Sequence, residues 1–560
     1  MAEPRASSPE TRTEHDAMGP VEVPANALYG AETARAVRWA LTPQRLPLPV
    51  VHALGRIKAA AAFAHGAAGR LAPELADAIE RAAREVAEGR HDDQFVVDLF
   101  QTGSGTSSHM NANEVIANRA GQLLGDALGS SRVRAHDDVN RGQSSNDVIP
   151  SAIRLAALDR GERVLLPALT ALAEALHGLA ERHWDDVRNG RTHLMHAMPI
   201  RFGQQFRGMA ERVEAAAARI RISLDACRAL PLGGTAVGTG VTCPPGFAAA
   251  VCERIGAAFG QRVHETAHHL SAQGWLGAVA DLAADLRTAA AGLYKLVDDV
   301  RWQASDAVHD VAIPDLQPGS SIMVGKVNPV VCEAALMACA QVFGNDAVVA
   351  FAESQGRFEL NTMLPVVARN VLESIELLAA AANAFREHVL QGLTVRPDAD
   401  AAVARNPILA TALMADVGHA RAVEIAQEAV RRGVTVADAA GGVGLDEAAL
   451  RERLDPRRLC GEIGRTRPRP GADTMTPNDE GPRPRSSEPQ LPDPQAVLRD
   501  PALSRAQKID KLRRLAYDAR EIEVANEEGM GGPPRTTNLA AIQAALRELG
   551  ADDPPASHKQ

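Results

Sequence analysis

Three long segments of the chain carry apolar side chains at alternating spacings of three and four residues. They cover residues 165–179, 279–300 and 367–389. The apolar positions are Leu165, Leu169, Leu172, Leu176 and Leu179 in the first, Val279, Leu282, Leu286, Ala289, Leu293, Leu296 and Val300 in the second, and Val367, Val371, Ile375, Leu378, Phe385 and Val389 in the third. This spacing predicts amphipathic helices whose apolar stripe faces a core.

The length of these segments and the composition together predict a mainly α-helical protein with a long central bundle. Helices near 25 residues are about twice the average length in globular proteins, and helices of that length pack nearly parallel. Of the 560 residues, 46% are hydrophobic but only 3% are aromatic. The core therefore depends on Ala, Leu and Val, a mixture that favours helices over sheets. Bundles of this length often continue into partner subunits.

Changes in composition divide the chain into five parts. They are an N-terminal domain at 1–139 that opens with a polar tail at 1–18, the bundle at 140–396, a small helical domain at 397–464, a linker at 465–498 and an extension at 499–560. The linker is rich in Pro, Gly and charge, so it is predicted to be disordered. The extension reads as two short amphipathic helices, which suits a small docking module.

The net charge, the cysteines and the apolar runs argue against a nucleic-acid-binding, secreted or membrane protein. The formal net charge of −10 and the lack of a long basic run in the first 460 residues argue against nucleic-acid binding. The six cysteines show no CxxC spacing, which favours reduced thiols in the cytoplasm. The N-terminus lacks the apolar core of a secretion signal, and no uninterrupted apolar run reaches the roughly 18 residues of a membrane span. We expect a soluble, cytoplasmic protein without a membrane partner.

Four polar, glycine-containing stretches interrupt the segments that are predicted to be helical. They are QTGSGTSSHMNANE from Gln101, VNRGQSSND from Val139, GRTHL from Gly190 and GSSIMVGKVNP from Gly319. In the first, Ser104 and Thr106 precede a helical segment, and a loop that feeds a helix N-terminus attracts anions. In the second, Ser144, Ser145 and Asn146 are three consecutive neutral donors ahead of a helix. Ordinary helix caps and turn glycines remain the alternative for each stretch taken alone.

The other two stretches carry a histidine and a lysine. GRTHL places Thr192 beside His193, and a lone histidine is more often structural than catalytic. In GSSIMVGKVNP, Lys326 supplies a fixed positive charge, Asn328 an amide, and Ser320 and Ser321 two hydroxyls, a set that suits a carboxylate. A nucleotide-binding P-loop is disfavoured because a valine follows the lysine.

Metal and hydrolase chemistry have little support in the sequence. No metal-ligand spacing stands out, because the adjacent His268 and His269 would point to different sides of a helix. A serine hydrolase is also disfavoured, since the chain has no G-x-S-x-G elbow. We expect no metal and no cofactor.

These stretches, in this order, resemble the fumarase/aspartase superfamily, and within it class II fumarases. GSSIMVGKVNP is similar to the signature GSSxMPxKxNP, and TGSGTS, QSSND, GRTHL and GGTAVGTG accompany it over about residues 13–460. The resemblance implies a three-domain, mainly helical subunit whose bundle forms the core of a homotetramer. It also implies composite active sites built from segments of three subunits. The linker and the extension lie outside the resemblance.

The resemblance implies reversible, metal-independent addition of water to fumarate, with anti geometry, to give (S)-malate. Ser104, Ser145 and the segment GRFELN from Gly356 favour a fumarase over an aspartase. The alternatives are an aspartate ammonia-lyase, or a related lyase acting on a substituted succinate, and a catalytically silent structural member of the superfamily. In each catalytic case the partner is a small dicarboxylate.

Residue roles also follow from the resemblance. Ser320 would be the base, and His193, paired with Glu333, would handle the water or hydroxyl on the other carbon. The substrate-binding residues would be Ser104, Thr106, Ser144, Ser145, Asn146, Thr192, Ser321, Lys326 and Asn328.

Several positions depart from the family pattern. Val324 replaces a proline, His109 replaces an asparagine, and His196 replaces an aspartate. The family's secondary anion motif H-P-N-D is replaced by the segment 134–137, which reads R-A-H-D. We therefore expect an altered secondary anion site beside an intact set of chemical residues.

Overall fold

The computed structural model describes residues 10–463 except 131 and 443, residues 493–527 except 502, and residues 539–551. The chain forms two compact units, Met1–Arg467 and Pro468–Gln560, and each is described here by itself. Most of the linker predicted at 465–498 and the start of the polar tail lie outside the described residues.

The N-terminal part of the first unit is a small helical layer with one hairpin. Its elements are β1 (Thr11–Asp16), β2 (Gly19–Pro24), α1 (Ala31–Val37), α2 (Leu48–Ala67), α3 (Pro73–Ala87), η1 (Asp92–Gln94) and α4 (Thr106–Leu123). Helices α2 and α3 approach closely at Gly55, where a Cβ would lie 2.5 Å from the backbone nitrogen of Ala87. The Glu114 carboxylate on α4 accepts backbone N–H bonds from Gly30 and Glu32, which fixes α1 against α4.

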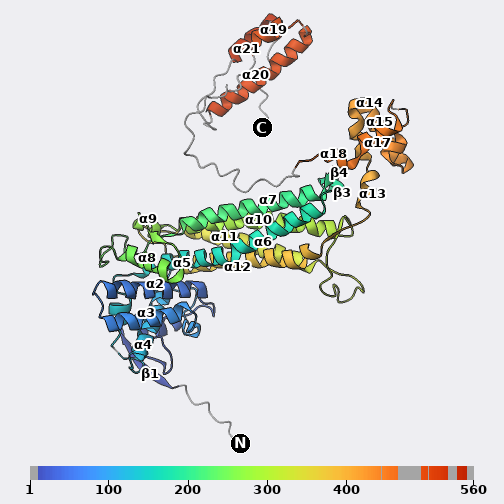
Figure 1. Ribbon diagram of the computed structural model, residues 1–560. Coiled ribbons are helices and arrows are strands. Elements are labelled where there is room, and N and C mark those ends of the chain that lie inside the picture. Colours follow the sequence, from blue (N-terminus) through green and yellow to red (C-terminus); the bar gives the residue numbers. More distant parts are fainter. Residues whose placement is uncertain are drawn as a thin grey trace. The chain divides into compact units, whose positions relative to one another are not determined.

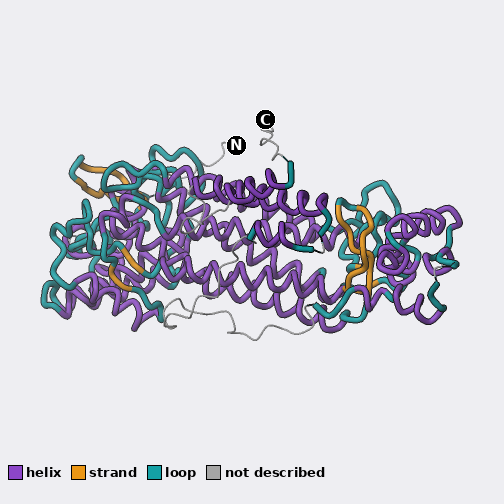
Figure 2. Tube along the Cα trace, turned by 90° about the horizontal axis from the view of Figure 1, so that it is seen from above, coloured by secondary structure: helices purple, strands orange, loops and turns teal. Residues whose placement is uncertain are grey.

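Long helices then form the central bundle, as Figures 1 and 2 show. The bundle contains η2 (Ala135–Val139) at its entry, α5 (Ser145–Arg160), η3 (Gly161–Leu165), α6 (Leu166–Arg182), α7 (Phe202–Ala226), α10 (Ala278–Ala304), α11 (Val330–Glu353) and α12 (Leu364–His388). The three striped segments of the sequence form α6, α10 and α12, and their stripes are buried in one continuous core. The prediction of a mainly helical protein with a long bundle is confirmed.

Two parts of the bundle are long and apolar enough to cross a membrane by length and composition. They are the nearly continuous helix Ser145–Arg182 and α11. A π-helical turn joins α5 to α6 at Gly161, where a Cβ would lie 2.6 Å from the Leu224 side chain. Both parts pack lengthwise against other helices of the bundle, as core helices of a soluble protein do.

Short strands and helices close the two ends of the bundle. At one end lie β5 (Ala229–Leu230), β6 (His264–Glu265), α8 (Phe247–Phe259) and α9 (His269–Gly274), and at the other lie β3 (Val187–Thr192), β4 (Met195–Arg201), β7 (Val311–Ala312), η4 (Leu390–Gly392) and β8 (Thr394–Val395). Strands β3 and β4 pair antiparallel, and so do β7 and β8.

The segment after the bundle has an apolar cluster of its own. It contains α13 (Ala399–Ala404), η5 (Pro407–Leu413), α14 (Met414–Val417), α15 (His419–Arg432), α16 (Val436–Ala439), α17 (Glu447–Leu454) and α18 (Pro456–Leu459). Leu409, Leu413, Ile425 and Val436 form the centre of that cluster.

The second unit contains α19 (Pro494–Arg499), α20 (Arg505–Glu527) and α21 (Leu539–Glu548), which enclose Val497, Leu512, Ala516, Ile542 and Leu546. The sequence pattern predicts two short helices in the extension. The described residues there have two, α20 and α21, and α20 spans 23 residues, whereas α19 lies almost entirely in the segment predicted as a linker.

Candidate active site

Hydroxyl groups from two of the predicted stretches meet at one end of the bundle. The Ser104 Oγ lies 2.7 Å from the Thr106 Oγ1, which lies 2.8 Å from the Ser145 Oγ. Thr106 is the first residue of α4 and Ser145 the first residue of α5. Gly105, at φ 74°, supplies the left-handed turn that precedes α4. Two helix N-termini therefore share a chain of neutral donors, an arrangement that attracts an anion.

The QSSND stretch is both a helix cap and an anchor for the segment that begins at Pro231. The Ser144 side chain caps α5, and the Asp147 carboxylate accepts the backbone N–H of Ser144 in return. Asp147 also accepts the N–H groups of Gly233 and Thr235. Burial raises the pKa of this carboxyl, while those three hydrogen bonds oppose the rise. The Asn146 Nδ2 donates to the carbonyl of Ala236 at 2.8 Å, so the glycine-rich turn lies directly beside the hydroxyl cluster.

The GRFELN segment completes this end of the site. Its Asn361 N–H donates to the carbonyl of Gln273, whose side chain donates to the carbonyl of Thr235. The backbone of Gly103 packs directly against Thr362, the residue after Asn361. A Cβ added at Gly103 would lie 1.8 Å from the Thr362 carbonyl oxygen. Only glycine fits this contact, and the Leu364 N–H donates to the Gly103 carbonyl at 3.0 Å.

GRTHL forms the tip of the β3–β4 hairpin at the opposite end of the bundle. Thr192 pairs with Met195, so His193 and Leu194 make a two-residue turn with φ of 54° and 62°. Positive φ at both positions is typical of a hairpin turn and strained for residues other than Gly, Asn or Asp. Thr192 and His193 are exposed, and among the described residues His193 has no hydrogen-bond partner. The strained tip therefore holds its histidine outward.

An ion pair joins this hairpin to the segment that precedes GSSIMVGKVNP. The Arg191 guanidinium contacts both carboxylate oxygens of Asp310, one of them at 3.1 Å. Asp310 is buried and directly precedes β7. The hairpin and the loop are thus held at the same end of the bundle.

The loop 319–329 is closed at its neck and exposed at its tip. The Asn328 Nδ2 donates to the Gly319 carbonyl at 2.7 Å. The Ser320 Oγ accepts the backbone N–H groups of Ile322 and Met323, at 3.3 and 2.9 Å. Ser321 and Val324 are exposed. The loop therefore already surrounds the Ser320 oxygen with backbone donors.

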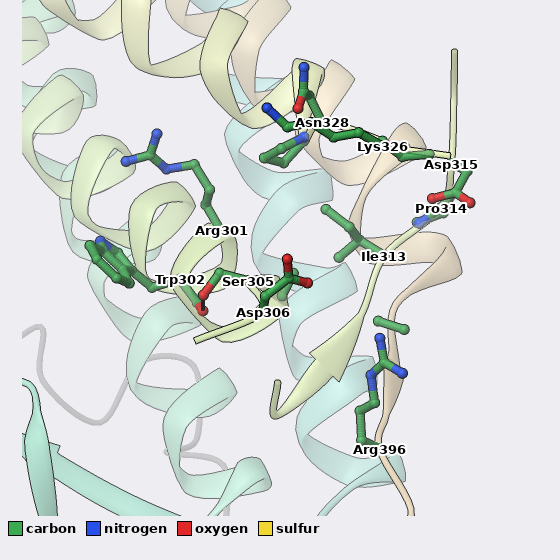
Figure 3. Close-up of a pocket in the computed structure, with 14 residues that line it drawn as sticks. Arg301, Trp302, Ser305, Asp306, Ile313, Pro314, Asp315, Lys326, Asn328 and Arg396 are labelled. Carbon is green, nitrogen blue, oxygen red and sulfur yellow. Dashed lines mark hydrogen bonds between the residues drawn. The ribbon is translucent and has the colours of Figure 1, made fainter. Parts of the chain in front are cut away.

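Lys326 and Asn328 line a cavity of about 490 Å³ beneath this loop (Figure 3). Arg301, near the end of α10, and Arg396, after β8, line the same cavity, together with the carboxylates of Asp306 and Asp315. No carboxylate in the described part of the chain lies within ion-pair distance of Lys326. Its charge is therefore available to an anionic ligand.

Glu333 lies in the first turn of α11 and is exposed. The Glu333 backbone N–H donates to the carbonyl of Pro329, but the described residues provide its side chain with no hydrogen-bond partner, so the expected pairing with His193 is not formed within one subunit. Both side chains lie at the same end of the bundle.

The predicted site residues therefore fall into two groups. Ser104, Thr106, Ser144, Ser145 and Asn146 lie where α12 begins, beside Gly103, while Thr192, His193, Ser320, Ser321, Lys326, Asn328 and Glu333 lie where α12 ends, near β7 and β8. Helix α12 has 25 residues, which is about 37 Å at the α-helical rise. One subunit does not bring the two groups together.

In the segment 134–137, which replaces the family's secondary anion motif, the basic side chains form ion pairs or contacts with carboxylates. Arg134 pairs with Asp137 at 2.7 Å, and His136 contacts Glu32 at 2.5 Å. Each basic group here faces a carboxylate. The described residues contain no group of three or more His, Cys, Asp or Glu side chains that could hold a metal ion.

Sequence reasoning missed three groups near these sites. Lys58 is fully buried in α2 and contacts His109 and Asn140. Asp147 and the Arg191–Asp310 pair were also overlooked. A lone lysine within the apolar run from Ile57 to Ala62 is a signal that could have revealed the first of them.

Comparisons with known proteins give the same picture over most of the chain. Residues 19–344 match the family described as Lyase, and residues 409–461 match the family described as Fumarase C C-terminus. The class II fumarate hydratase of Pseudomonas putida is 44% identical over 438 residues, which cover 77% of this chain and 94% of that protein. A class II fumarate hydratase of Pseudomonas aeruginosa is 43% identical over 80% of this chain and 98% of its own length.

Solved structures agree with the sequence relatives. The class II fumarase of Schistosoma mansoni superposes with a TM-score of 0.79 at 30% identity, over 81% of this chain and all of that one. The fumarate lyase:delta crystallin of Brucella melitensis superposes with a TM-score of 0.77 at 37% identity, over 80% of this chain and all of that one. The chain therefore belongs to the fumarase/aspartase superfamily of lyases, close to the class II fumarases.

Proposed function

We propose that this protein is a fumarate hydratase that interconverts fumarate and (S)-malate without a metal. The observation that carries the proposal is the presence of two anion-binding groups of different character. One is the hydroxyl cluster at two helix N-termini, and the other is the Lys326 loop with its cationic cavity. A four-carbon dicarboxylate presents one carboxylate to each. The relatives named class II fumarate hydratase, at 41–44% identity, support this reading.

We further propose that the active site is assembled from three subunits of a homotetramer. About 37 Å separates the two groups within one subunit, whereas a four-carbon substrate must touch both. Helix α11 also leaves large apolar side chains exposed, among them Met337 (67%) and Phe351 (59%). An apolar face of this kind is expected where helices of partner subunits pack together.

Removal of the malate C–H proton is the difficult step, and Ser320 is the proposed base. A serine hydroxyl is a very weak acid, so its alkoxide must be stabilised. The N–H groups of Ile322 and Met323 already point at this oxygen. Lys326 is placed on the same loop to stabilise the negative charge that develops on the adjacent carboxylate. Ser321 and Asn328 contribute the remaining donors and the shape of the loop.

His193 is proposed to act on the opposite face of the substrate, where water leaves or adds. Because Glu333 is unpaired within the subunit, a Glu333 from a partner can orient His193 and favour its charged form. Thr192 lies beside His193 at the hairpin tip and would bind the carboxylate on that side. Ser104, Thr106, Ser144, Ser145 and Asn146 would bind the other carboxylate with neutral donors.

The proposal places the enzyme in the cytoplasm as a soluble protein with no nucleic-acid partner. The absence of a disulfide among its six described cysteines supports this placement. All six are free, and burial raises the pKa of Cys227 to about 11 and of Cys252 to about 12. Such thiols are unreactive at neutral pH.

The test follows the ultraviolet absorbance of fumarate with purified protein, first with malate and then with aspartate as substrate. We expect fumarate from malate, no ammonia or fumarate from aspartate, and the same rate after treatment with a chelator. Turnover of aspartate alone would assign the site to an ammonia-lyase. A rate abolished by the chelator and restored by a divalent metal would contradict the metal-independent mechanism.

A further inference from the structure

A lysine lies buried between the two segments that build the hydroxyl cluster. Lys58, in the middle of α2, has no exposed surface. Its Nζ lies 2.8 Å from the Nε2 of His109 on α4 and donates to the Oδ1 of Asn140 at 2.9 Å. A buried amine costs free energy unless its hydrogen bonds are satisfied. The proposed mechanism gives it no role.

We propose that Lys58 is a positioning residue that holds the starts of α4 and α5 in register, so that both bind the same substrate carboxylate. This inference rests on the proposed function of the hydroxyl cluster. His109 is one helical turn beyond Thr106 on α4. Asn140 is tied to the start of α5 because its Nδ2 donates to the carbonyl of Gln143, the residue before the Ser144 cap.

Lys58 is the shared donor between these two segments. Without it, α4 and the 140–146 segment would still pack through their apolar sides, but among the described residues the Thr106–Ser145 hydrogen bond would be the remaining side-chain hydrogen bond that fixes their relative position. The Thr106–Ser145 hydrogen bond alone is too weak for that purpose, since one neutral hydrogen bond contributes only about 1 kcal/mol.

The buried surroundings of Lys58 make the protonation of its amine depend on the charge of the bound ligand. Titratable groups near it are His109 on α4 and the buried Asp147 on α5, with His136 acting on His109 from η2. Burial lowers the pKa of Lys58 to about 7, with Asp147 opposing the change. Burial also keeps the pKa of His109 well below its usual value, so the ring is neutral and, in the tautomer protonated at Nδ1, its Nε2 accepts from the amine. A dianion bound at the nearby hydroxyls favours the protonated amine, so ligand binding should take up protons above neutral pH.

The experiment measures binding of succinate, a non-reacting four-carbon dicarboxylate, to the full-length protein and to Lys58→Met by titration calorimetry. Methionine keeps the length of the side chain and removes its N–H donors. We expect the succinate Kd to rise about tenfold, the amount that loss of one hydrogen-bonded tether supports. The KM for malate should rise in parallel while kcat changes less than about threefold. Lys511→Met, which alters an exposed lysine on α20, is the matched control and should leave all values unchanged.

Two further readouts separate positioning from a merely structural role. Calorimetry in buffers of different ionisation enthalpy should show proton uptake by the wild type at about pH 8 and less uptake by Lys58→Met. On a Thr106→Ala background, Lys58→Met should have a smaller effect on the Kd than on the wild type, because the positioned hydroxyl is gone.

The inference is overturned if the Kd and the proton uptake of Lys58→Met equal those of the wild type. It is also overturned if the Kd rises only together with a lower melting temperature and loss of the assembly. Succinate binding that depends on Lys58 in a protein that turns over neither malate nor fumarate would refute the proposed function alone. A wild-type protein that fails to bind succinate would refute both.

Discussion

Replacing Gly103 by alanine tests whether the hydroxyl cluster needs the close contact between the TGSGTS stretch and the start of α12. The added Cβ would lie 1.8 Å from the Thr362 carbonyl oxygen and 2.7 Å from its carbonyl carbon. Ordinary contacts of this kind are longer by about 1.5 Å, so one backbone must move by roughly that amount. The Leu364–Gly103 hydrogen bond would break. Ser104 and Thr106 follow directly and would move with it.

Overpacking of this size costs about 1–3 kcal/mol of folding free energy, and a displacement of about 1 Å at a substrate-binding group costs about 100-fold in rate. We therefore expect Gly103→Ala to form the same assembly but to lose about 100-fold in kcat/KM, followed by fumarate absorbance. The matched control is Gly178→Ala in α6, where a Cβ meets no atom within 4 Å. It should keep full activity and gain about 0.5–1 kcal/mol in denaturant unfolding. A Gly103→Ala enzyme with activity within about threefold of the wild type would refute the reasoning.

Three other substitutions probe the loop, the hairpin and the buried lysine. Ser320→Ala should keep helicity and assembly but lose at least about 100-fold in kcat; near-normal turnover would remove Ser320 from its role as base. Asp310→Asn leaves the Arg191 charge unpaired and should cost about 3 kcal/mol or more in denaturant unfolding, whereas Asp77→Asn, which breaks an exposed pair, should cost less than about 1 kcal/mol. Because the pKa of Lys58 falls from 10.5 to about 7 on folding, the unfolded chain binds more protons than the folded chain at pH values between these two pKa values. Wild-type stability should therefore rise with pH relative to that of Lys58→Met between about pH 7 and 10.5, by at most about 5 kcal/mol. A stability difference that does not depend on pH would contradict the lowered pKa of the buried lysine.

The bundle could be predicted from the sequence because its helices carry apolar stripes at helical spacing. Leu282, Leu286 and Leu293 are all buried on α10, as their spacing requires. The sequence of α11 shows no such stripe, because its own apolar residues lie on all sides of the helix. Many of them are exposed in the single subunit. Its pattern becomes intelligible only when a partner subunit is expected to cover it.

The candidate site could be predicted as a set of residues but not as an arrangement. Ser145 and Thr106 were foreseen as helix-terminal donors, and their hydrogen bond agrees with that expectation. The hairpin that displays His193 was not foreseen, because His193 and Leu194 adopt positive φ, which their residue types do not suggest. Motif order along the chain also gives no hint that α12 separates Ser145 from Ser320, since that separation is a property of the tertiary fold.

In the proposed tetramer, each active site takes its hydroxyl cluster and its loop from different subunits. Two variants test it directly, one with Thr106 and Ser145 both replaced by alanine and the other with Ser320→Ala. Each alone should be nearly inactive. Random assembly of equal amounts by co-expression should restore about a quarter of the wild-type activity, because each site then has an intact cluster and an intact loop with independent probabilities of one half. Activity of mixed assemblies that equals only the sum of the two variants would contradict the claim.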